Sequence, residues 1–252
     1  LSQKEIRANM DRIVADFNAI ARSHEKKTRV GIVGEIYVKY SPLGNNRLEE
    51  FLRTQDCEYM LPGLMGFILF KIDNRIEDIK LYGGNPLKKL LCTFLKKYVQ
   101  KMERMLIESI SSCPAFVPPS AFEHTKSLVR DVIGYGCKMG EGWLLTAEML
   151  ELAENGYENI ICAQPFGCLP NHIAGKGMIR RLTQVHPGIN IVPIDYDLSA
   201  TKVNQENRIR LMLAVAGDSL KKKQQQELLI AQDEAAEKSC GGDCDGCRKN
   251  AG

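Results

Sequence analysis

The residues best suited to chemistry lie in one proline-rich loop. It runs from Cys162 through Cys168 to His172, with the sequence Cys-Ala-Gln-Pro-Phe-Gly-Cys-Leu-Pro-Asn-His. The surrounding pattern predicts a strand before the loop and a helix after it, and open α/β sheets bind ligands at such carboxyl edges. The helix N-terminus favours a thiolate at Cys168, and thiolates bind iron or zinc. A functional thiolate and a structural cysteine remain open alternatives, and a hydrogen-bonded loop histidine is the simpler interpretation of His172.

A glycine-rich turn covers residues 134–142, and an acidic pair near residue 195 falls at the same predicted edge as the cysteine loop. The turn precedes a helix, whose free backbone N–H groups can receive an anion, although a tight turn is the simpler interpretation. The acidic pair ends a strand, where it can hold a metal, bind a ligand hydroxyl or cap the next turn. The residues concerned are Cys137, Gly140, Glu141, Gly142, Asp195 and Asp197.

The C-terminal tail carries three further cysteines, Cys240, Cys244 and Cys247, in C-x₃-C-x₂-C spacing. Three thiolates this close can hold one metal ion or an iron–sulfur cluster. Radical S-adenosylmethionine enzymes use the same spacing early in a barrel domain, whereas here it ends the chain, so we reject that interpretation. A metal-binding or redox tail and a disordered tail remain alternatives.

Composition narrows the class of protein. The chain has 252 residues, a net charge of +3, 44% hydrophobic residues and nine cysteines, which suits one large domain or two modest ones with a buried core. The longest apolar stretch, residues 61–70, is far shorter than the ~20 residues of a membrane span, and no signal peptide is evident. We therefore expect a cytoplasmic protein with free thiols and no membrane contact. Scattered lysines argue against nucleic acid as a partner.

The first part of the chain predicts a strand–helix–strand unit. A helical pattern covers residues 3–21, a strand covers 29–38, a helix follows Asn45, and a short strand lies near 59–61. Such a unit predicts a parallel sheet. Residues 87–110 form the clearest amphipathic helix, with lysines mainly off its apolar stripe. A solvated helix face is the simpler interpretation of these lysines, and an acidic partner is the alternative.

Prolines near residues 114–119 mark a boundary, after which a second helix and strand series begins. We expect helices over 120–133, from 143, over 172–185 and over 204–216, with strands over 159–163 and 189–194. This pattern predicts an α/β fold of two lobes with mostly parallel sheets: residues 1–115, residues 116–217, and a polar helix with the cysteine tail over 218–252. Since the chain begins at Leu1 on a helical pattern, we expect it to be part of a longer protein.

Three phrases resemble a known family. They are Gly140-Glu-Gly-Trp-Leu-Leu-Thr-Ala-Glu-Met149, the cysteine loop continued to Gly177, and Ile194-Asp-Tyr-Asp-Leu-Ser with Val203-Asn-Gln-Glu-Asn-Arg. They are similar to the C-terminal part of large activase-related proteins of the 2-hydroxyacyl-CoA dehydratase and double-cubane-cluster superfamily. The resemblance covers roughly residues 28–216, with residues 30–40 similar to the entry strand.

The resemblance implies Rossmann-like lobes and a 4Fe–4S cluster in anaerobic metabolism, with an ATPase activator domain or dehydratase subunits as partners and a homo-oligomer also compatible. It implies a cluster-ligand role for Cys168, with Cys162 and Cys137 as helpers, and a cofactor pocket shaped by Gly140, Glu141, Gly142 and Asn171. The family's ATP-binding segments and its earlier cluster cysteines have no counterpart here, so we expect an incomplete cluster site. The alternatives are a metal-free interaction lobe that docks an ATPase domain, and a small-molecule transferase that uses Asp195 and Asp197.

Overall fold

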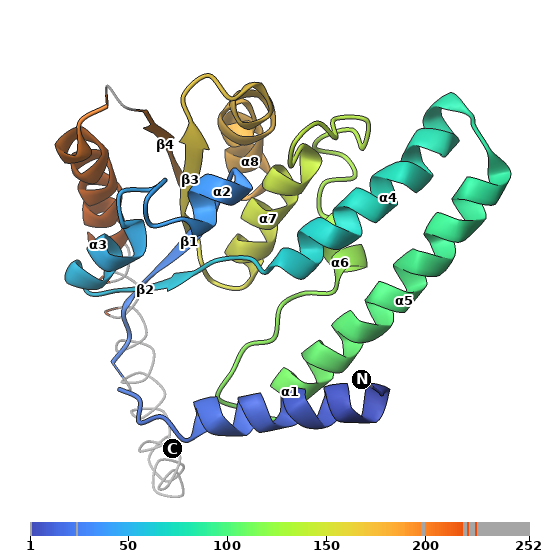
Figure 1. The fold of residues 1–252 in the computed structure, drawn as a ribbon. Helices are drawn as coiled ribbons and strands as arrows, with labels where there is room; N and C mark the ends of the chain where they lie inside the picture. Colours follow the sequence, from blue (N-terminus) through green and yellow to red (C-terminus); the bar gives the residue numbers. More distant parts are fainter. Residues whose placement is uncertain (1, 24, 198–199, 219–220, 222–224, 226–252) are drawn as a thin grey trace, which may run out of the picture.

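The fold is built on one four-stranded sheet in which all strands are parallel (Figure 1). The computed structural model describes residues 2–23, 25–197, 200–218, 221 and 225. The α/β class and the parallel strands are therefore confirmed. The strand order is β2-β1-β3-β4, with β1 at Thr28–Gly34, β2 at Cys57–Met60, β3 at Asn159–Pro165 and β4 at Asn190–Tyr196.

Strands that we expected in two separate sheets share this one. β1 pairs directly with β3, from Val30 beside Asn159 to Gly34 beside Ala163. Both strands are apolar almost throughout and nearly fully buried, so each needs a neighbour on both sides and helices over both faces. The prolines near residues 114–119 consequently lie in a connection within the fold and do not separate two sheets.

Helices cover both faces of the sheet (Figure 1). The core on one face centres on Trp143, which is fully buried and meets the ring of Phe70 edge-on at 5.0 Å. Leu52 and Ile209 anchor the core on the other face. The first face carries α4 (Leu64–Tyr82), α6 (Phe122–Ser127), α7 (Trp143–Glu154) and α8 (Ile179–Val185); the second carries α3 (Leu48–Thr54) and the helix over residues 202–218.

Two long helices form an arm beside the sheet. α4 and α5 (Pro86–Ser111) pack against each other, and α1 (Gln3–Asn18) crosses α5 near its C-terminal end (Figure 1). Arg7 of α1 pairs with Glu108 of α5 at 2.7 Å. The long helix predicted over residues 87–110 is confirmed, whereas α4 was not foreseen. Among the described helices none has the length and apolar character needed to cross a membrane.

The structure corrects several element boundaries. β1 ends at Gly34, whose φ of 145° and close approach to the carbonyl of Ala163 turn the chain, and α2 (Ile36–Tyr40) replaces the expected continuation of the strand. The helix expected over 120–133 stops at Ser127. The one expected over 172–185 is divided into a π-helix at Asn171–Gly175, a short 3₁₀ turn and α8. The predicted helix over 218–239 falls mostly, and the cysteine tail entirely, outside the described residues.

Candidate functional site

The glycine-rich turn and the cysteine loop meet at the carboxyl edge of the sheet. A Cβ placed on Gly140 would lie 3.2 Å from the ring of Pro170, so the two segments are in contact. The ammonium of Lys71 donates a hydrogen bond to the carbonyl of Gly140 at 2.6 Å. This contact fixes the turn against α4 and defines one wall of the candidate site.

Cys168 lies in the loop immediately after β3. Gly167 takes a φ of 74°, and the amide of Cys168 then donates to the carbonyl of Pro165 at 3.2 Å. The thiol is half-buried, and the Nδ2 group of Asn171 donates a hydrogen bond to its Sγ at 3.2 Å. Asn171 opens the π-helix, a rare element that occurs often at functional sites. Cys168 therefore combines an N–H donor to sulfur with a position at the sheet edge.

Two buried amide groups beside this loop lack part of their hydrogen bonding. Gln164 and Asn171 are both 0% exposed. Nε2 of Gln164 donates to Oδ1 of Asp195 at 2.6 Å and lies 3.5 Å from Nδ1 of His172. Within the described residues, however, Oε1 of Gln164 and Oδ1 of Asn171 have no partner. Each buried acceptor without a hydrogen bond lowers the stability of the folded state by roughly 1–3 kcal/mol. We call Gln164, Cys168, Asn171, His172 and Asp195 the edge cluster.

Cys162 lies beneath the edge cluster, on β3. Its side chain is fully buried, and a Cβ on Gly175 would come within 2.9 Å of its Sγ. Burial, followed by the negative charges of Asp195 and Glu148, raises the pKa of the Cys162 thiol to about 12. The thiol is thus protonated at neutral pH, and its position suits a packed wall rather than an open metal ligand.

The glycine-rich turn has structural explanations for its special residues. The amide of Trp143 donates to the carbonyl of Cys137 at 2.7 Å, and burial raises the pKa of the Cys137 thiol. Gly142 has a φ of 49°, and a Cβ there would lie 2.2 Å from that same carbonyl oxygen. Oε1 of Glu141 accepts a hydrogen bond from the amide of Ile36 at 3.2 Å, which caps α2. These contacts explain the turn without a bound cofactor.

The donor set does not fit a complete cluster. Among the residues that the structure describes, no three histidine, cysteine or acidic side chains gather closely enough to hold a metal ion. Asp195, which we had considered as a ligand-binding acid, receives a hydrogen bond from Gln164 instead. Cys168 fits a single ligand position at the edge, and Cys240, Cys244 and Cys247 lie outside the described range.

A buried ion pair between α2 and α7 was not predicted from the sequence. Nζ of Lys39 lies 3.1 Å from Oε2 of Glu148, and their side chains are 4% and 6% exposed. Burial opposes the charge of Lys39, but the carboxylate of Glu148 outweighs it and raises the pKa of the lysine. The only signals were a lysine within an apolar run and a glutamate within a buried helix. The polar Gln164 at the end of an apolar strand was a comparable signal.

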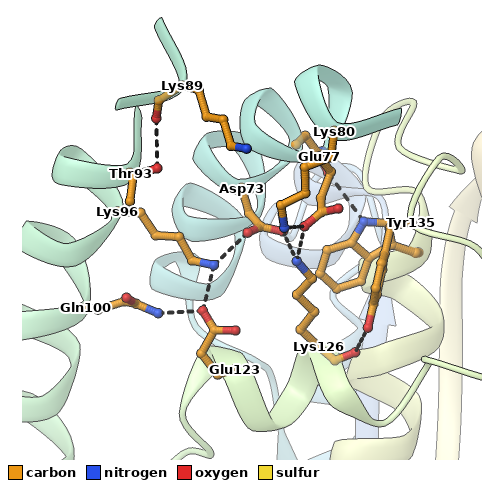
Figure 2. Close-up of polar contacts among 12 residues, drawn as sticks. Asp73, Glu77, Lys80, Lys89, Thr93, Lys96, Gln100, Glu123, Lys126 and Tyr135 are labelled. Carbon is orange, nitrogen blue, oxygen red and sulfur yellow. Dashed lines mark hydrogen bonds and ion pairs between the residues drawn. The ribbon is translucent and has the colours of Figure 1, made fainter. Parts of the chain in front are cut away.

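A cluster of charged residues joins α4 to α5 and α6 (Figure 2). Asp73 of α4 is 1% exposed and accepts hydrogen bonds from both Lys96 of α5 and Lys126 of α6, each at 2.6 Å. Lys126 also pairs with Glu77 at 2.8 Å, and Lys96 pairs with Glu123 at 2.6 Å. We call these five residues the junction network. Since every charge in the network is paired, we assign it the structural role of holding α4, α5 and α6 together.

An open cavity of about 110 Å³ lies between the end of β2 and helices α4, α5, α6 and α7. Its wall is mainly apolar but includes Glu103, Glu148 and Glu151. Burial raises the pKa of Glu103 and of Glu151. Glu151 accepts hydrogen bonds from the amide of Ser120 and the hydroxyl of Thr125. None of the predicted cofactor residues lines this cavity, which is therefore separate from the edge cluster.

Comparison of the chain with protein-family models, with curated proteins and with solved structures finds no match.

Proposed function

We propose that this protein is an iron–sulfur electron-transfer component of a 2-hydroxyacyl-CoA dehydratase or activase-like system. In this proposal Cys168 supplies one thiolate to a 4Fe–4S cluster. The observation that carries it is the hydrogen bond from Nδ2 of Asn171 to Sγ of Cys168 at the carboxyl edge of the sheet. An N–H donor stabilises charge on sulfur, and hydrogen bonds to cluster sulfurs tune the reduction potential.

The remaining ligands come from outside the described residues in this proposal. No second and third donor accompany Cys168 in the described part of the chain, so the cluster is shared with a dehydratase subunit or an ATPase activator domain. When bound, the cluster supplies one-electron chemistry. The chain's own residues hold and orient the Cys168 thiolate through Asn171, while Cys162 closes the wall behind it. The function implies a cytoplasmic, anaerobic setting.

Anaerobic reconstitution with ferrous iron and sulfide tests this function. The starting variant carries serine at Cys240, Cys244 and Cys247, so that the tail contributes no ligands, and a small thiol in the buffer fills ligand positions that the chain leaves open. We expect the broad visible absorbance of an iron–sulfur cluster, lost in Cys168→Ser. Cys92→Ser is the matched control, because Cys92 is a half-buried thiol on α5. Equal iron and sulfide contents in the Cys168→Ser and Cys92→Ser variants would overturn the proposal.

The second candidate is a metal-free Rossmann-like interaction lobe that docks an ATPase domain. It is supported by the structural explanations for Glu141 and Gly142, and by the lack of further donors beside Cys168 in the part of the chain that the structure describes. This candidate predicts that neither the starting variant nor Cys92→Ser acquires iron and sulfide above the Cys168→Ser level. The same reconstitution series therefore separates the two functions.

A further inference from the structure

The N-terminal half of α5 exposes a contiguous apolar face. Phe94 is 71% exposed and Leu87 is 70% exposed, values unusual for large apolar side chains that lie next to one another. The complete set is Leu87, Leu90, Leu91, Phe94, Leu95 and Tyr98. The opposite face of α5 packs on α4 and α6, where Lys96 reaches the junction network and Val99 joins the core of the first sheet face.

The spacing of the exposed residues suits another helix. Leu87, Leu91, Phe94 and Tyr98 follow one another at intervals of four, three and four. This is the a/d repeat with which a helix receives the knobs of a partner helix. Leu90 and Leu95 lie at g and e positions of the same register and widen this apolar face. In the same register Lys88 occupies an e position and Lys97 a g position, the places where coiled-coil helices form ion pairs with their partner.

The charge around the stripe has one sign. Residues 86–102 contain five lysines and neither aspartate nor glutamate. Lys96 is turned inward to Asp73 and Glu123, whereas Lys88, Lys97 and Lys101 are exposed. A second copy of this face would place lysine against lysine, and like charges across an interface favour a different partner. A helix with acidic edges matches both the apolar stripe and the lysines.

We propose that the exposed face of α5 docks an amphipathic helix of a partner protein whose apolar stripe is edged by aspartate or glutamate. The Leu87–Tyr98 stripe supplies the apolar contact, and Lys88 and Lys97 select the acidic edges. This surface goes beyond the function proposed above and does not depend on Cys168, because it lies on the arm and not at the edge cluster.

Two synthetic helices of equal length test the surface. Both carry leucine at the a and d positions, and one has glutamate at e and g while the other has lysine there. Fluorescence anisotropy of each labelled peptide against the full chain gives its affinity. We expect the glutamate-edged peptide to bind at least about tenfold more tightly at low salt, with the difference shrinking as salt increases. Equal affinities, or no binding of either peptide, would contradict the proposal.

Variants of the chain assign the contact. Phe94→Asp should abolish binding of the glutamate-edged peptide, and the control Leu43→Asp should not, since Leu43 is 85% exposed on a distant turn. The double variant Lys88→Glu, Lys97→Glu should reverse the preference between the two peptides. Circular dichroism confirms that each variant is folded.

Other occupants of the face give different results. Tighter association with phosphatidylserine vesicles than with either peptide, lost in Phe94→Asp, would replace the helix by a lipid surface. A concentration-dependent dimer in sedimentation, lost in Phe94→Asp, would replace it by a second copy. Either result overturns the partner helix, and neither bears on the reconstitution of a cluster at Cys168.

Discussion

The junction network and the edge cluster both contain buried polar side chains, yet they differ in how completely these side chains are hydrogen-bonded or paired. In the junction network Asp73, Glu77 and Lys126 have charged partners within 2.8 Å. In the edge cluster Oε1 of Gln164 and Oδ1 of Asn171 are buried without one among the described residues. Satisfied charges fix helices in place, whereas unsatisfied acceptors cost stability in the resting fold. We therefore expect substitutions in the junction network to lower stability more than substitutions in the edge cluster.

The largest expected effect is at the junction network. Lys126→Met removes the more buried of two cations beside Glu77, leaving the half-exposed Lys80, and one of the two cations beside Asp73. We expect the free energy of unfolding to fall by about 3 kcal/mol, because the remaining carboxylates stay buried with too little positive charge. Urea denaturation measures the change. Lys97→Met, at an exposed position of α5, should stay within about 0.5 kcal/mol of wild type. Similar losses in both variants would break the comparison.

The second expected effect separates two cysteines of the edge region. Because burial raises the pKa of Cys162 to about 12, its thiolate is scarce at mildly alkaline pH, whereas Cys168 is half-buried in a surface loop. Iodoacetamide should alkylate Cys162 at least about a hundredfold more slowly than Cys168 in the folded protein, as followed by peptide mass spectrometry. Unfolding in urea should remove the difference. Comparable alkylation rates of Cys162 and Cys168 in the folded protein would show that the reagent reaches Cys162, which contradicts its enclosure beneath the edge cluster.

A third prediction concerns the packing beneath the edge cluster. Gly175→Ala forces a methyl group to within 2.9 Å of Sγ of Cys162 and should lower the free energy of unfolding by about 1–3 kcal/mol. In a Cys162→Ala background the same substitution should cost much less, because the opposing sulfur is gone. Gly134→Ala is the control, since a Cβ there meets nothing within 4 Å. An unchanged cost in the Cys162→Ala background would place the strain elsewhere.

The smallest expected effect concerns Glu103, which lies beside the junction network but outside its ion pairs. Burial raises the pKa of Glu103, so the native state holds this proton more tightly than the unfolded chain, and stability falls as pH rises through the native pKa. The amide in Glu103→Gln does not ionise, so the variant does not lose this stability as pH rises. We expect its free energy of unfolding to exceed that of wild type by less than about 1 kcal/mol at neutral pH and to match it below about pH 4.

Glu123→Gln supplies the opposite sign for the same measurement. Burial favours the protonated form of Glu123, but the hydrogen bond and charge of Lys96, with the contributions of Gln100 and Lys126, together outweigh burial and lower the pKa. Stability from this carboxylate is present at neutral pH and lost as pH falls through its native pKa. The variant should therefore be less stable than wild type at neutral pH. If Glu103→Gln and Glu123→Gln shift the free energy of unfolding in the same direction at neutral pH, the ion pair of Glu123 does not explain how stability depends on the two carboxyl groups.

The predicted elements succeeded where local pattern and burial agree. β1, β3 and β4 are strands, and α5 and α7 are helices, because continuous apolar runs and helical periodicity mark them directly. The prediction missed α4, whose first residues form an apolar run without clear periodicity. It extended β1 past Gly34, since the turn there depends on the approach of the β3 backbone. Patterns within one segment do not contain such contacts between segments.

In the edge cluster, too, some residues could be predicted from the sequence and others could not. Cys168, His172 and Asp195 followed from their places after strands, because the carboxyl ends of parallel strands converge. Gln164 and the role of Asn171 did not, since an unpartnered amide oxygen becomes visible only once every neighbour is placed. The sequence placed Cys162 at the end of a strand and Cys168 in the loop after it; the structure shows that the first side chain is buried in the core and the second is half-buried.

The sequence by itself determined the α/β class, the parallel strands, the long α5 helix and the cysteine loop at a strand end, because each depends on local periodicity or on the order of elements along the chain. The tertiary structure decided that one sheet unites both halves, that Cys168 at the sheet edge receives an N–H donor from Asn171, and that the apolar face of α5 points outward. Each of these depends on which surfaces meet, and residues far apart in the chain fix that choice.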